Sequence, residues 1–143
     1  MKAVPDLALL APGQELPERM FQCEPVQLFL YNAALWNADR IHFDHPHATT
    51  VEGYPALVMA GPLLGDWLAQ AANEWLGDAG FLRSIEYSNR RACYVGDVLR
   101  SVGQGKSVDA KSGDVVLDVA IVNQRDEIAL PGTVVVNLGR TAP

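Results

Sequence analysis

The sequence predicts an α+β fold in which an antiparallel sheet wraps around one long helix. Two observations lead to this class. Residues 62–76 carry apolar side chains at helical spacing, and the chain beyond them contains several strand-like stretches separated by turn residues. A helix followed by a run of strands is typical of α+β domains. The chain of 143 residues has the length of one domain, so we expect a single domain over residues 1–143.

The helix is the strongest local signal in the sequence. Pro62 suits the first turn of a helix, where its missing N–H costs nothing. Gly77 and Gly80 then provide stop signals. The apolar positions between them predict a buried face, with both tryptophans in the core: Leu63, Leu64, Trp67, Leu68, Ala71, Trp75 and Leu76.

Four stretches after the helix have strand character: residues 81–87, 92–104, 115–122 and 133–138. Turn residues separate them, among them Gly96-Asp97 and Pro131-Gly132. Together these stretches predict an antiparallel meander.

The first third of the chain is less regular. Residues 1–19 contain three prolines and are expected to form an irregular lead-in. Residues 20–35 favour extended structure interrupted at Pro25, although residues 31–36 are also compatible with a short helical turn. Residues 37–56 form a polar connection, and long connections in compact domains are often functional.

Composition excludes several classes of protein. The chain has 11 Lys and Arg against 17 Asp and Glu, a net charge of −6, which argues against a nucleic-acid partner. Cys23 and Cys93 have no metal-site or disulfide spacing and are expected to be buried thiols in a reducing compartment. Val4-Pro5-Asp6 interrupts the apolar run near the start, and no stretch approaches the ~18 apolar residues of a membrane span. We therefore expect a cytoplasmic protein with no membrane contact.

Residues 35–44 gather a histidine, an amide and two carboxylates. His42 is the best proton carrier, because imidazole has an ordinary pKa near ~6.5; the alternative is a structural loop histidine. Asn37 is able to hold a water molecule but not to act as a base. Asp39 is a second acid/base candidate, or else a solvated or ion-paired carboxylate. His45 and His47 lack the spacing of a metal site, so we expect no bound metal.

Gly61 is a candidate for binding a carbonyl oxygen. Its lack of a side chain lets a substrate approach the backbone N–H, and the start of a helix adds positive potential. Pro62 has no N–H, so the donor is Gly61 or a neighbour outside the helix. The alternative is that Gly61-Pro62 is a plain helix-start signal.

Several motifs resemble one known group of proteins. They are Pro12-Gly13-Gln14-Glu15-Leu16, Tyr94 to Leu99 with its Gly96-Asp97, and the stretch from Asn123-Gln124 to Val134. With these, the chain resembles the hotdog-fold acyl-thioester hydratases and dehydratases of the MaoC-like group over nearly its whole length. That fold is a curved antiparallel sheet around one long helix.

The active-site motif of the R-specific hydratases in this group is D-x-N-P-x-H, and the matching stretch is residues 37–42. His42 falls on the catalytic histidine, Asn37 on the catalytic Asp, Asp39 on the Asn and Arg40 on the Pro. The local motifs W-N-x-x-R-I-H-x-D, E-G-Y-P and G-P-L resemble more closely those of one subgroup, which contains mesaconyl-CoA hydratases and fungal mitochondrial 3-hydroxyacyl-thioester dehydratases.

This resemblance implies reversible hydration of an enoyl thioester carried by coenzyme A or a carrier protein, with no separate cofactor. His42 would be the acid/base, Asn37 would orient water, and the Gly61 N–H would bind the thioester oxygen. Arg90 and Arg91 are candidates for a coenzyme A phosphate or a substrate carboxylate, although a surface ion pair is an equal alternative.

The resemblance also implies a homodimer, with His42 of one chain near Gly61 of the other. The apolar stretches 115–122 and 133–138 add a reason for assembly, because they are too apolar to stand exposed at a sheet edge in a monomer. Two other functions remain open. One is a hotdog thioesterase that uses Asp39 or Glu52 to activate water; the other is a non-catalytic hotdog subunit, which the Asn at position 37 favours.

Overall fold

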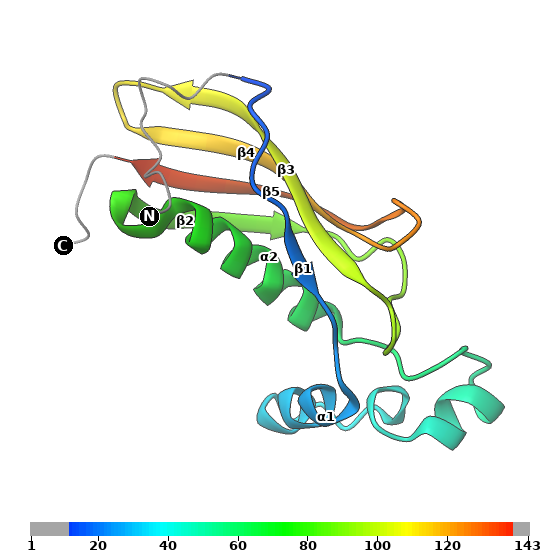
Figure 1. The fold of residues 1–143 in the computed structure, drawn as a ribbon. Helices are drawn as coiled ribbons and strands as arrows, with labels where there is room; N and C mark the ends of the chain where they lie inside the picture. The colour runs from blue at the N-terminus through cyan, green and yellow to red at the C-terminus, as the bar shows by residue number, and fades with distance from the viewer. Residues whose placement is uncertain (1–11, 139–143) are drawn as a thin grey trace.

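The computed structural model describes residues 12–138, which form a five-stranded antiparallel sheet curved around a long helix (Figure 1). The helices are α1 (Pro25–Ala34) and α2 (Gly61–Leu76). The strands are β1 (Arg19–Phe21), β2 (Gly80–Tyr87), β3 (Leu99–Asp109), β4 (Asp114–Val122) and β5 (Ile128–Leu138). Their order in the sheet is β1-β3-β4-β5-β2. The predicted α+β class is confirmed.

Helix α2 provides one side of the core. Pro62 lies in its first turn, and Gly77, with φ of 55°, follows its last residue, as the sequence predicted. Leu68 and Leu76 are almost fully buried against sheet residues such as Leu117 and Val134. Burying each such side chain contributes roughly 1.5–3 kcal/mol. Of the two tryptophans, Trp67 is buried and Trp75 is partly buried against the core.

Trp67 also links α2 to the start of the chain. Its ring stacks on Phe21 of β1 with centroids 4.9 Å apart. Strand β1 is short, and it pairs with β3 through Arg19 opposite Ser101 and Phe21 opposite Leu99. The sheet therefore closes over α2 only when two segments far apart in the sequence meet.

Two strand boundaries differ from the sequence prediction. β3 begins at Leu99 rather than at residue 92, because the N–H of Asp97 bonds the carbonyl of Tyr94 in a turn that precedes the strand. β5 begins at Ile128 and contains Pro131 and Gly132, which were expected to form a turn. Pro131 lacks an N–H, but its carbonyl still accepts from the N–H of Ser88 just beyond the end of β2, so it costs the sheet only the bond that it is unable to donate.

Residues 20–35 correct a second expectation. Only residues 19–21 are extended, and Pro25 starts helix α1 instead of breaking a strand. The helix buries Leu28 and Asn32, which lie one turn apart, and leaves most of its surface exposed. Its apolar residues therefore have no clear helical period in the sequence, which explains the wrong prediction.

The polar connection after α1 contains two short helical segments, a 3-10 turn at Arg40–His42 and a π-helical turn at His47–Val51. Together with α1, it forms a lobe beyond the end of the sheet, next to the start of α2 (Figure 1). We call residues 25–56 the lobe. Most of the large apolar side chains that are exposed in the described residues belong to it: Val26, Phe29, Leu30, Leu35, Trp36, Phe43 and Val51.

The edges of the sheet are not where the sequence argument placed them. Strands β4 and β5, which contain the apolar stretches 115–122 and 133–138, are inner strands, and β1 and β2 form the edges. The apolar character of β4 and β5 is explained by burial within the sheet and against α2. It therefore gives no independent reason for a second subunit.

Residues 12–138 contain no helix that is both long enough and apolar enough to span a membrane.

One carboxylate ties three strands together and gives a test of the fold. Asp114 at the start of β4 accepts a hydrogen bond from Asn137 of β5 at 2.6 Å and from Arg83 of β2 at 2.8 Å. The Asn137 amide, followed by Arg83, holds the pKa of Asp114 below its ordinary value. A carboxylate with a lowered folded-state pKa stabilises the fold above its unfolded pKa, and that contribution is lost as the pH falls through the folded pKa.

We therefore expect Asp114→Asn to lower Tm at pH 7, and the gap from the unmodified protein to shrink as the pH is lowered below the ordinary Asp range. Thermal melts between pH 7 and pH 3 measure this. Asp78→Asn is the matched control, since the described residues give this exposed carboxylate no hydrogen bond or ion pair. A gap for Asp114→Asn that is constant over this range would contradict the assignment.

Candidate active site

His42 lies at the end of the 3-10 turn in the lobe and is only 7% exposed. Its Nδ1 atom is 2.7 Å from the carbonyl oxygen of Val58. Because a carbonyl oxygen only accepts hydrogen bonds, Nδ1 must carry the proton. In the neutral ring, Nε2 then has a lone pair available to accept a proton. The local structure thus fixes the tautomer that a general base needs.

The backbone around Val58 connects His42 to the body of the protein. The N–H of Val58 donates to the carbonyl of Ile41 at 3.0 Å, so both ends of this residue are bound to the lobe. On the other side, the N–H of Met59 donates to the carbonyl of Cys93 at 2.8 Å, and the N–H of Val95 donates to the carbonyl of Leu57 at 2.9 Å. Residues 57–59 therefore lie between the histidine segment and residues 93–95, and they lead directly into α2.

The turn before His42 uses the side chains of both other candidates. Asp39 caps it by accepting from the N–H of Ile41 at 3.3 Å, and Asn37 accepts from the N–H of Asp39 at 3.1 Å. Asp39 is exposed, whereas Asn37 is half-buried. These bonds are typical of Asp and Asn in turns. Asp39 therefore caps the turn that leads to His42. The side-chain oxygen of Asn37 is occupied, and its amide nitrogen remains available as a donor.

Two further pairs of polar side chains lie in the lobe. Arg40 binds Asp44 at 2.7 Å, and this hydrogen bond holds the pKa of Asp44 below its ordinary value. His47 lies 3.4 Å from Glu52, and His45 is exposed. Within residues 12–138, no three His, Cys, Asp or Glu side chains come together in a way that would hold a metal ion.

A pocket of about 350 Å³ opens at the start of α2. Gly61, Arg90 and Arg91, which the sequence proposed separately, line it together. The other lining residues are Val58, Met59, Leu64, Asn89, Ala92 and Cys93. His42 does not line the pocket itself, but it bonds to the carbonyl of Val58, which does. Asn37 and Asp39 do not line it either.

The charges of the pocket come from its two arginines. Arg91 lies 3.7 Å from Glu127, which Arg125 also binds at 2.9 Å. In the described residues, Arg90 has no carboxylate partner, so its charge is available to an anion. Burial raises the pKa of the Cys93 thiol to about 11, so this residue is an unreactive thiol at neutral pH. Cys23 and Cys93 are both buried and free, as predicted.

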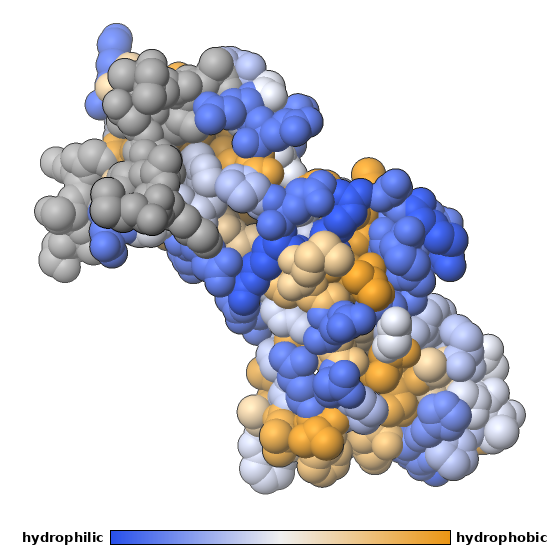
Figure 2. Space-filling model, in the orientation of Figure 1, coloured by the Kyte–Doolittle hydropathy of each residue, from blue (hydrophilic) through white to orange (hydrophobic). Residues whose placement is uncertain are grey.

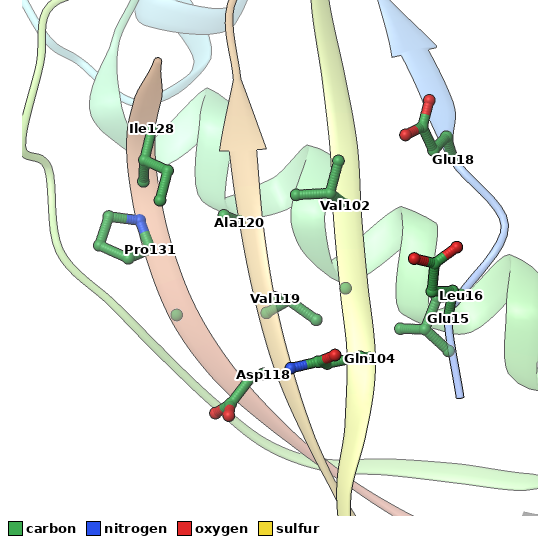
Figure 3. Close-up of a pocket in the computed structure, with 12 residues that line it drawn as sticks. Glu15, Leu16, Glu18, Val102, Gln104, Asp118, Val119, Ala120, Ile128 and Pro131 are labelled. Atoms are coloured by element: carbon green, nitrogen blue, oxygen red, sulfur yellow. The ribbon is translucent and has the colours of Figure 1, made fainter. Parts of the chain in front are cut away.

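A larger cavity, of about 550 Å³, lies on the face of the sheet away from α2 (Figure 3). Carboxylates such as Glu18 and Asp118 stand around apolar residues of β3, β4 and β5. None of the residues proposed from the sequence lines it. The histidine and the helix start therefore mark the pocket at Gly61 as the candidate active site.

Two residues of the candidate site were not singled out by the sequence analysis. Val58 is one residue of an apolar run, and its role depends on its carbonyl, which any residue provides. Asn89 lines the pocket beside Gly61. Its place two residues after a predicted strand, and next to Arg90, was the only available signal.

The sequence argument placed His42 near Gly61 of a second chain, and this shared site stays a prediction. Within its own chain, His42 bonds to the carbonyl of Val58, three residues before Gly61.

Comparison with known proteins places the chain in a family. The family model described as hydroxyacyl-thioester dehydratase type 2 matches residues 9–95. The (R)-hydratase from A. caviae, described as involved in PHA biosynthesis, has the same fold, with a TM-score of 0.83 and 19% identity over 92% of this chain and 98% of that one. The chain belongs to the hydroxyacyl-thioester dehydratase type 2 family and has the MaoC-like hotdog fold that its motifs indicated.

Two curated relatives share part of the sequence. The mesaconyl-C(4)-CoA hydratase of Chloroflexus aurantiacus is 41% identical over 63 residues, which are 44% of this chain and 22% of that protein. The mitochondrial hydroxyacyl-thioester dehydratase type 2 of Schizosaccharomyces pombe is 44% identical over 45 residues, which are 32% of this chain and 15% of that protein. The present chain spans about half the length of these relatives.

The His42 geometry predicts a tautomer that NMR detects directly. With the ring neutral, long-range ¹H–¹⁵N spectra should show the proton of His42 on Nδ1, because the Val58 carbonyl accepts it. The exposed His45 serves as the internal reference, since neither of its ring nitrogens is bound within the described residues. A His42 signal with the proton on Nε2 would show that this ring is not set up to accept a proton there.

Proposed function

We propose that this chain catalyses the reversible hydration of a 2-enoyl thioester, which in the other direction is the dehydration of a 3-hydroxyacyl thioester. The observation that carries the proposal is the buried His42, whose Nδ1 is bound by Val58 beside the pocket at Gly61. Membership of the hydroxyacyl-thioester dehydratase type 2 family supports the same reaction.

The proposed chemistry needs one proton carrier and one site for negative charge. His42 Nε2 takes a proton from water as the water oxygen bonds to the β-carbon. The imidazolium then returns that proton to the α-carbon, so that one water is added across the double bond. In between, charge develops on the thioester oxygen. We assign its stabilisation to the N–H of Gly61, which as the first residue of a helix has no partner within that helix.

Asn37 is the residue that we propose for holding the water or the β-hydroxyl group. Its oxygen is occupied by the N–H of Asp39, so its NH₂ group is the donor that remains for a substrate oxygen. Asp39 is assigned no proton transfer, because its carboxylate is exposed and caps the turn.

The reaction needs no separate cofactor, because the coenzyme A or carrier-protein thioester is part of the substrate. We propose Arg90 as the main anion contact, for a phosphate or a substrate carboxylate, since Arg91 is close to Glu127. The thioesterase alternative requires a free carboxylate, but Asp39 caps a turn and Glu52 is paired with His47. The two buried free thiols fit a reducing compartment, which supports a cytoplasmic location.

We also propose that the chain works as a homodimer or a multiple of it. β2 is an edge strand of eight residues with its outer backbone groups available for pairing. The lobe adds exposed apolar side chains, including Trp36 at 94% exposure, and Figure 2 shows this apolar surface on the lower part of the molecule. Exposed apolar surface of this kind marks interaction sites.

The activity is tested with a panel of enoyl-CoA substrates, including short, long and dicarboxylic acyl chains. We expect the enoyl absorbance to change without release of free thiol. His42→Ala should lower kcat by about 10²- to 10⁴-fold, the usual contribution of a proton-transfer group. His45→Ala is the matched control and should leave kcat nearly unchanged, because this histidine is an exposed loop residue.

Other outcomes of this assay support the alternatives. Thiol release would favour a thioesterase, and silence in both readouts would favour a non-catalytic subunit. A loss of less than about fivefold in a folded His42→Ala variant would remove His42 from the mechanism.

Assembly is tested by light scattering on a sample of known activity. We expect a mass of at least twice the 15.5 kDa of one chain, and a loss of activity when the protein is diluted below its dimerisation constant. Full activity in a sample with the mass of one chain would rule out the dimer proposal.

A further inference from the structure

Helix α2 has two glycines one turn apart, and another side chain fills the space beside each. A β-carbon added to Gly61 would lie 2.4 Å from Nδ2 of Asn89. A β-carbon added to Gly65 would lie 2.3 Å from Cζ of Tyr87. Residues four apart share one face of a helix. This face therefore receives the side chains of Tyr87 and Asn89.

The backbone that carries Asn89 is fixed. Tyr87 and Asn89 are two residues apart, as expected for side chains on one side of an extended segment. Beyond the end of β2, this segment continues to pair with β5. Ser88 N–H donates to Pro131 at 3.0 Å and Arg90 N–H donates to Ala129 at 2.9 Å. Asn89 is held between these two bonds, so its carboxamide is brought to the start of α2 by the sheet itself.

The carboxamide of Asn89 is available to a ligand. Asn89 lines the same pocket as Gly61 and Val58, and no hydrogen bond joins its side chain to any other described residue. A carboxamide has two N–H donors. Asn89 is exposed in the free protein. A ligand that covers it must satisfy these donors, because a donor removed from water without a partner is costly. The group that suits both Asn89 Nδ2 and the Gly61 N–H is an oxygen with negative charge.

We propose that Asn89 is a catalytic residue that donates a hydrogen bond from Nδ2 to the thioester carbonyl oxygen, beside the Gly61 N–H. This inference rests on the proposed function and adds to it a second oxyanion donor. Both donors are in place before charge develops, one at a helix start and the other on a strand extension. Preorganised donors of this kind lower the barrier because they need no reorganisation during the reaction.

The same contact makes the position of the Asn89 side chain depend on the glycine at position 61. A β-carbon at Gly61 and the Asn89 carboxamide would occupy the same space. Gly61→Ala should therefore push Asn89 away from the pocket and impair both donors at once. If so, the losses in Gly61→Ala and Asn89→Ala will not add in the double variant, as is usual for residues in contact.

The test combines kinetics with a direct readout of the carbonyl bond. Asn89→Ala should lower kcat for enoyl-CoA hydration by about 10²- to 10³-fold with little change in KM, which is the usual cost of losing one oxyanion donor. Asn89→Asp should be at least as impaired, because a carboxylate has the same shape but donates nothing and repels the charge. Gln104→Ala is the control, since this exposed amide lies on β3 away from the pocket.

Infrared difference spectra of bound butanoyl-CoA with a ¹³C-labelled carbonyl supply the second readout. This saturated thioester binds but is not hydrated. We expect its carbonyl stretch to lie at a higher frequency in Asn89→Ala than in the unmodified protein, because one polarising hydrogen bond is lost. A purely structural role for Asn89 would change the melting temperature and the rate but not this frequency.

The outcomes separate this inference from the proposed function. An active protein in which Asn89→Ala stays within fivefold, or loses activity with an unchanged carbonyl frequency, overturns the role of Asn89 alone. A protein that binds butanoyl-CoA but hydrates no enoyl thioester overturns the proposed function, while the frequency shift still decides whether Asn89 is a donor. A protein that binds no thioester overturns both.

Discussion

The hydrogen bond between His42 and the carbonyl of Val58 is the interaction on which the candidate site depends. It joins the lobe to the segment that starts α2, and residues 93–95 hold the same segment from the other side. Losing either contact would release one side of the segment that joins His42 to the helix start. The bond is made by a backbone carbonyl, so the residue type at position 58 matters for packing and not for the contact itself. The path of the backbone therefore sets the orientation of the His42 ring.

Sequence patterns predicted the elements that bury a regular apolar face along their whole length. Helix α2 has a clear apolar period between Pro62 and Gly77, and its bounds were correct. Helix α1 buries only two side chains, so its period was too weak to read, and Pro25 was misread as a strand breaker. Pro131 and Gly132 have turn composition, yet they lie in β5, where Ser88 still donates a hydrogen bond to Pro131. This pairing depends on tertiary structure, which a local sequence pattern does not show.

The candidate site likewise contains residues that the sequence marks and one that only the structure reveals. A motif and a helix start mark His42 and Gly61 as candidates in the sequence, and the structure places Gly61 with Arg90 and Arg91 in one pocket. Asp39 was a candidate of the same motif, and the structure adds that its side chain caps the turn by accepting from the N–H of Ile41. Asn89 had no motif, and its contact with the helix start depends on the missing β-carbon of Gly61, 28 positions earlier in the chain. Such a contact is invisible to any local pattern.

The pairing of β1 with β3 has a consequence for how the protein folds. Arg19 of β1 donates its N–H to the Ser101 hydroxyl across a separation of 82 residues, and the whole lobe lies within the loop that this pairing closes. Closing so long a loop costs chain entropy before the contacts form, which slows the step. Strands β3, β4 and β5 are joined by short connections and are able to pair without it. We therefore expect the hairpins to form first, and the lobe with its histidine to be fixed in place only when β1 joins the edge of the sheet.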